Sequence, residues 1–168
     1  MLTKNDFPPP DWNTLRNTQY LVGVAMVMAG ASGLGTIKEL AALSQQIIQN
    51  QASGIPLIRD LTAISEMQAA QASLKQSLGG QEAKPTSDSM RRLALDEARS
   101  SLAILGPKAS KEETDAYRQL LYGIADKVAH AAREGGFLGF GGTEVSEGEQ
   151  SFLTELRSTL QLEEAKTA

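Results

Sequence analysis

The chain has 168 residues, of which 41% are hydrophobic, 21% charged and 5% aromatic, and it contains no cysteine. This length and composition predict a single globular domain with a sizeable core. A net charge of −4 argues against binding nucleic acid or an anionic membrane surface. The lack of cysteine excludes disulfides and thiolate metal sites and fits a reducing cytoplasm, the location that we predict.

The first ten residues contain three successive prolines after Phe7 and lack the basic-then-apolar pattern of a signal peptide. Residues 1–10 are therefore predicted to form an extended, Pro-rich arm. Asp11 is a plausible N-cap for a first helix over about residues 12–29. Trp12 stands next to this arm, where it could contact a partner or cover the core of its own domain.

Residues 17 to 58 contain only two charged side chains, Lys38 and Glu39. So long a stretch with almost no ionised group must be covered by the rest of the chain, by another copy or by lipid. Its solidly apolar part, residues 20–29, is about ten residues long, whereas a membrane span needs about 20. A buried helix is therefore favoured over a transmembrane one.

Two further helices are predicted in the first half, over about 36–51 and 57–78. Pro56 separates them because proline removes a helical hydrogen bond. Residues Leu57, Ile64, Gln71 and Leu78 are seven apart, which is typical of a coiled-coil seam with one polar member. The second and third helices are expected to be the most completely shielded.

The second half predicts three more helices. The first covers about 89–105 and the next follows the capping box Ser110 to Glu113. The last begins at a second capping box, Ser146 to Glu149. The domain is expected to span residues 11–162, and 163–168 should be a frayed tail.

A glycine-rich segment at 135–142 precedes the last helix. It does not match the phosphate-binding P-loop because Gly142 stands where the lysine is required. Two of the four phenylalanines, Phe137 and Phe140, lie in this segment. They either plug one end of the bundle or contact a partner.

His130, the single histidine, lies four residues after Asp126 and four before Glu134, which places all three on one helical face. This face points away from the apolar stripe, so a solvated histidine is favoured over a metal site. A ferritin-like di-iron site also requires two Glu-x-x-His pairs, and one histidine cannot supply them. Glu39 and Glu66 are the remaining weak metal candidates, because each lies in a helix poor in charge. If Glu39 or Glu66 formed a buried pair with an arginine, we would expect that pair to fix how the helices pack against one another and not to catalyse a reaction.

The sequence predicts an all-α, antiparallel bundle of five to six helices in a single domain. The preferred function is that of a non-enzymatic helical protein, without a cofactor, that self-associates or binds a protein partner. The first three helices would form its interface. The alternatives are a ferritin-like or other metal-dependent enzyme using carboxylates such as Glu39, Glu66, Asp96 and Glu97, and a protein attached peripherally to a membrane through residues 20–30. We predict neither a catalytic residue nor a bound metal.

Overall fold

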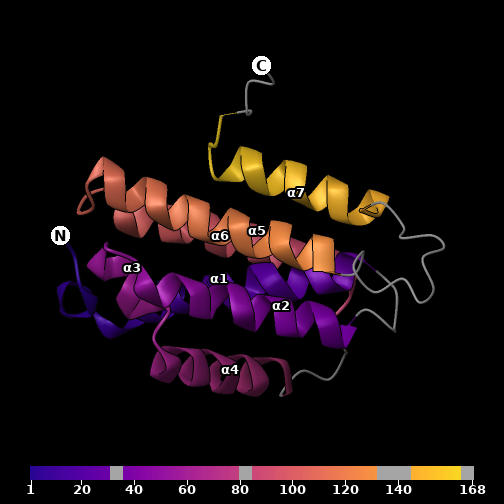
Figure 1. The fold of residues 1–168 in the computed structure, drawn as a ribbon, viewed down its shortest axis with the longest axis horizontal. Coiled ribbons are helices and arrows are strands. Elements are labelled where there is room, and N and C mark those ends of the chain that lie inside the picture. The colour runs from indigo at the N-terminus through magenta and orange to yellow at the C-terminus, as the bar shows by residue number, and fades with distance from the viewer. Residues whose placement is uncertain (31–35, 80–84, 132–144, 164–168) are drawn as a thin grey trace.

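The computed structural model describes residues 1–30, 36–79, 85–131 and 145–163 (Figure 1). Within these ranges the chain forms helices packed into one bundle, so the prediction of an all-α, single-domain fold is confirmed. The α-helices are α1 (Pro9–Ala29), α2 (Thr36–Gln49), α3 (Pro56–Leu61), α4 (Ile64–Gly79), α5 (Ser87–Leu105), α6 (Lys111–Ala131) and α7 (Glu147–Thr159), with short 3₁₀ helices at Lys4–Asp6 and Asn50–Ala52.

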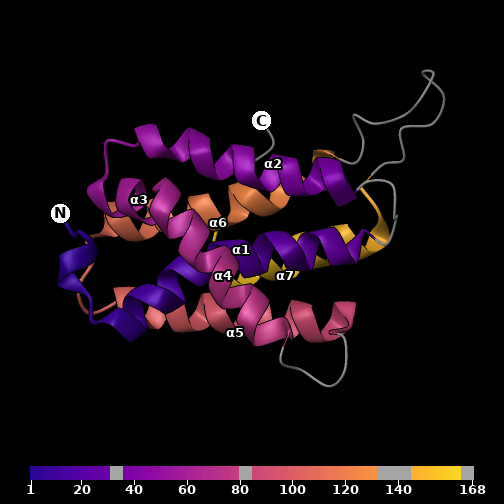
Figure 2. The same cartoon turned by 90° about the horizontal axis from the view of Figure 1, so that it is seen from below.

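Helix α1 is the centre of the bundle. It contacts α2, α4, α5, α6 and α7, and Figures 1 and 2 show these helices arranged around it. Residues on all sides of α1 are buried, among them Leu15, Tyr20, Val22 and Met26. The first helix is therefore the most shielded one, and the prediction that the second and third helices are shielded most is wrong. The absence of charge after Asn17 follows from this central position.

The N-terminus differs from the predicted extended arm. Lys4–Asp6 forms a 3₁₀ turn, and α1 begins at Pro9 with Pro8 as its N-cap instead of Asp11. Proline is well suited to the first helical turn because its missing N–H has no helical partner there. Phe7 is buried and its ring lies 5.9 Å from that of Trp12, which fixes the N-terminus to the bundle.

The third predicted helix is divided into α3 and α4. The side-chain amide of Gln19 donates to the Leu61 carbonyl at 2.8 Å, and that of Gln51 donates to the Thr62 carbonyl at 2.9 Å. These two amides donate to carbonyls that have no hydrogen-bond partner within the helix, because they lie at its end. The predicted coiled-coil seam is wrong, because the break interrupts it and Ile64 and Gln71 are exposed on α4.

Helix α2 packs closely on α1 because Gly23 has no side chain. A Cβ atom at Gly23 would lie 2.4 Å from Cδ1 of Leu43 on α2. The small residue in α1 therefore accommodates a neighbouring helix of the same chain. No second copy is needed to explain it.

Buried polar groups also connect α1 to its neighbours. The hydroxyls of Thr18 and Ser101 on α5 lie 2.9 Å apart, and the Tyr117 hydroxyl on α6 donates to the Leu15 carbonyl at 2.9 Å. Both predicted capping boxes are present, since Ser110 and Ser146 exchange side-chain to backbone hydrogen bonds with the glutamates three residues on.

Candidate functional site

A buried ionic cluster surrounds Glu66 at the start of α4. Its carboxylate accepts hydrogen bonds from Trp12 Nε1 at 2.9 Å and from Lys4 Nζ, and it lies 3.6 Å from Arg16 Nη1. The side chain of Glu66 is only 7% exposed. Burial alone would raise the pKa of Glu66, but the hydrogen bonds from Lys4 and Trp12 and the nearby positive charges outweigh it and lower the pKa.

This cluster holds the N-terminus, α1 and α4 together, and it leaves neither carboxylate oxygen of Glu66 without a hydrogen-bond donor. Both oxygens of Glu66 are engaged by cationic or N–H donors, which compete with a metal ion. Trp12 is 2% exposed, which agrees with the alternative that it covers the core of its own domain. Its apolar ring and its N–H are both used within the chain.

Of the other metal candidates, the structure describes the side chains of His130 and Asp126. His130 Nδ1 lies 2.8 Å from the Asp126 carbonyl and 3.6 Å from its carboxylate, and both side chains are nearly half exposed. Glu134, Phe137, Phe140 and the side chain of Glu39 lie outside the described residues. Among the residues that are described, no group of three or more His, Asp or Glu side chains could hold a metal ion.

The charge-poor residues 17–58 are buried in α1 but only partly buried in α2. In α1 it is buried, and Tyr20 to Met26 are not available as a membrane-binding surface. No helix in the described parts of the chain is long and apolar enough to cross a membrane. Helix α2 instead buries one side, with Ala42, Leu43 and Ile47, and exposes the other.

The exposed side of α2 forms a stripe that we call the α2 outer face. It consists of Ala41, Gln45, Ile48 and Gln49, all exposed and spaced four, three and one residues apart. Ile48 is 47% exposed and is the large apolar side chain of this face. No acidic or basic residue occurs between positions 41 and 58, so these four residues contribute no charge.

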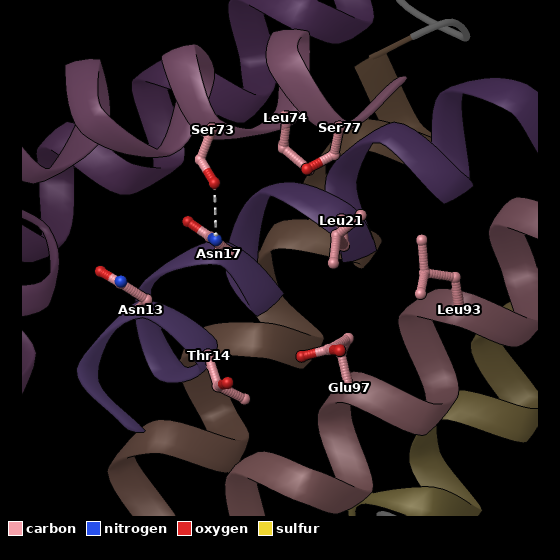
Figure 3. Close-up of a pocket in the computed structure, with 9 residues that line it drawn as sticks. All are labelled: Asn13, Thr14, Asn17, Leu21, Ser73, Leu74, Ser77, Leu93 and Glu97. Atoms are coloured by element: carbon pink, nitrogen blue, oxygen red, sulfur yellow. Dashed lines mark hydrogen bonds between the residues drawn. The ribbon is translucent and has the colours of Figure 1, made fainter. Parts of the chain in front are cut away.

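A pocket of about 340 Å³ lies between α1, α4 and α5 on another side of the bundle (Figure 3). Helix α1 contributes its floor, and α4 and α5 form two facing walls. Asn17 Nδ2 donates to Ser73 Oγ at 3.2 Å across the junction of α1 with α4. The lining residues are Asn13, Thr14, Asn17, Leu21, Ser73, Leu74, Ser77, Leu93 and Glu97.

Among the described residues that line this pocket, Glu97 is the one with a charged side chain. Burial raises the pKa of its carboxyl, and the neighbouring Asp96 raises it further. Asp96 itself is exposed and pairs with Arg99 at 2.6 Å. Sequence reasoning named Glu97 only as one of several carboxylates. It could not identify the pocket, because the facing serines come from a helix about 20 residues earlier in the chain.

Comparison with protein-family models, curated proteins and solved structures found no match for this chain. Its functional assignment therefore depends on the α2 outer face and on the pocket.

Proposed function

We propose that this chain is a non-enzymatic helical protein that associates with a second copy of itself through the α2 outer face. The observation that carries this proposal is that the exposed residues of α2 from Ala41 to Gln49 include no ionised side chain. Exposed helix faces normally contain charged residues, and large apolar side chains in their centre are uncommon.

Charge supports a second copy as the occupant. Two copies each with a net charge of −4 repel one another over most of their surfaces. A face without ionised groups avoids this repulsion at the contact and avoids the cost of desolvating unpaired charges. Glutamine side chains both donate and accept, so Gln45 and Gln49 can form hydrogen bonds with their own counterparts.

The spacing also fits a two-fold contact. In an isologous interface the same patch is used on both subunits, and residues near the axis meet their own copies. Ile48 lies within the stripe and would pack against Ile48 of the other copy, while Ala41 is small enough to allow close approach of the helices. Since a single helix pair is smaller than the roughly 1,200–2,000 Å² of a stable interface, we expect a dissociation constant in about the micromolar range.

Sedimentation velocity over a range of micromolar concentrations tests the proposal. The wild-type chain should shift from monomer to dimer, and Ile48→Lys should remain a monomer because it places two like charges at the contact. Ile64→Lys is the matched control, since Ile64 is also exposed, at 56%, but lies on α4. A wild-type chain that stays monomeric, or an Ile48→Lys chain that dimerises as well as wild type, would overturn the proposal.

A further inference from the structure

The Glu97 carboxylate in the pocket between α1, α4 and α5 has no partner. Within the described residues it makes neither an ion pair nor a hydrogen bond, although it is partly buried. Three other buried or half-buried carboxylates are engaged: Glu66 contacts three side chains, Glu113 is in a capping box, and Glu155 pairs with Arg91. An unpaired charge in such a setting is costly unless something binds it.

The groups around Glu97 are suited to a positively charged ligand. The pocket lining supplies hydroxyl oxygens from Thr14, Ser73 and Ser77 and the amide oxygen of Asn13, whereas the Asn17 amide oxygen already accepts from Arg16 Nε at 3.0 Å. An ammonium group has three N–H donors and no acceptor, so it requires one counter-charge and a few neutral oxygens. None of the described residues that line the pocket is basic, which disfavours an anionic ligand.

The remaining lining is apolar and selects for a short hydrocarbon chain. Leu21, Leu74 and Leu93 come from the three helices, and Figure 3 shows Leu21 and Leu93 beside Glu97. A bare divalent cation would gain nothing from these leucines and would require more than one carboxylate or several additional oxygens. The volume of about 340 Å³ is near the lower limit of small-molecule sites.

We propose that this pocket binds a small organic amine, with its ammonium group on Glu97 and its alkyl chain against the three leucines. The proposal goes beyond self-association, because the pocket and the α2 outer face share no residue.

Titration with n-butylammonium chloride, followed by the backbone amide chemical shifts of isotope-labelled protein, tests this site. We expect saturable shifts at Ser73, Ser77 and Glu97. The uncharged 1-butanol and potassium chloride at equal ionic strength should produce no saturable shift at these amides. Glu97→Gln should lower the affinity for n-butylammonium by about tenfold or more, since it removes a charge-assisted hydrogen bond.

Asp96→Asn is the matched control, because it removes the same charge from the adjacent residue, whose side chain is 71% exposed. It should bind n-butylammonium as wild type does. Leu93→Ala, at a position that is 39% exposed, should lower the affinity for n-butylammonium roughly threefold while leaving that for methylammonium nearly unchanged. The proposal is overturned if n-butylammonium produces no saturable shift, if 1-butanol or potassium chloride acts equally, or if Glu97→Gln binds as tightly as wild type.

Discussion

Replacing Glu66 by glutamine should destabilise the fold far more than loss of an ordinary acidic residue. The amide retains the shape of the carboxylate and one acceptor for Trp12 Nε1, but it removes the charge that faces Lys4 and Arg16. Lys4 is 55% exposed and can return to water, whereas the Arg16 side chain is only 10% exposed and would stay buried without its counter-ion.

Removing one partner of a buried ion pair costs about 3–5 kcal/mol, and the recovery of water by Lys4 reduces that cost. We therefore expect Glu66→Gln to lower the free energy of unfolding by about 2–4 kcal/mol. Urea denaturation followed by circular dichroism measures this change. The control Asp96→Asn breaks an exposed pair with Arg99 and should cost less than about 1 kcal/mol.

The pH dependence distinguishes the ionic effect from a packing defect. Since the folded-state pKa of Glu66 lies below its ordinary value of 4.5, its contribution to stability is present above pH 4.5 and is lost as pH falls through the folded-state pKa. The stability difference between wild type and Glu66→Gln should accordingly shrink below pH 4.5. A difference that is small at pH 7, or one that does not change with acidification, would refute this account of the cluster.

Two further substitutions test the packing around α1. Gly23→Ala should lower the free energy of unfolding by about 1–3 kcal/mol, because its Cβ would lie 2.4 Å from Leu43 Cδ1. The cost of Gly23→Ala combined with Leu43→Ala should be less than the sum of the single costs in thermal or urea denaturation, and full additivity would contradict the close contact. Tyr117→Phe should cost about 1 kcal/mol in the same assay, since it removes the hydrogen bond to the Leu15 carbonyl, and an unchanged stability would show that this bond contributes nothing.

The helices were largely predictable because their signals are local. The capping boxes at Ser110 and Ser146 predict the starts of α6 and α7, and Pro56 marks the start of α3. The break between α3 and α4 has no comparable signal, because it depends on Gln19, which is 42 residues from the Leu61 carbonyl. The role of Glu66 was likewise only half predictable: its isolation in a helix with few charges was visible, but its contacts with Lys4 and Trp12 were not.

The charge pattern predicted shielding correctly for α1 but not for α2. Both helices contain few charged residues, yet α1 is apolar on all sides from Tyr20 to Ala29, whereas α2 has one apolar side and a second side with alanine and glutamine. The pattern of apolar residues along each helix separates the central helix from the peripheral one, whereas the scarcity of charge, on which the prediction was based, does not. The pocket was not predictable, because its walls come from α4 and α5, and these helices come together only where both pack on α1.

Helix α4 buries less apolar side chain than α1: among its described residues only Glu66 and Ala70 are buried, Met67 and Leu74 are partly buried against the core, and Asn17 is bonded to Ser73. An element held by so little buried hydrocarbon opens at low free energy, so its amide protons should exchange with solvent sooner than those of α1 or α6. Because α4 forms one wall of the pocket, the same opening would control how quickly a molecule enters and leaves. A bound amine would join α4 to α5 and slow that exchange.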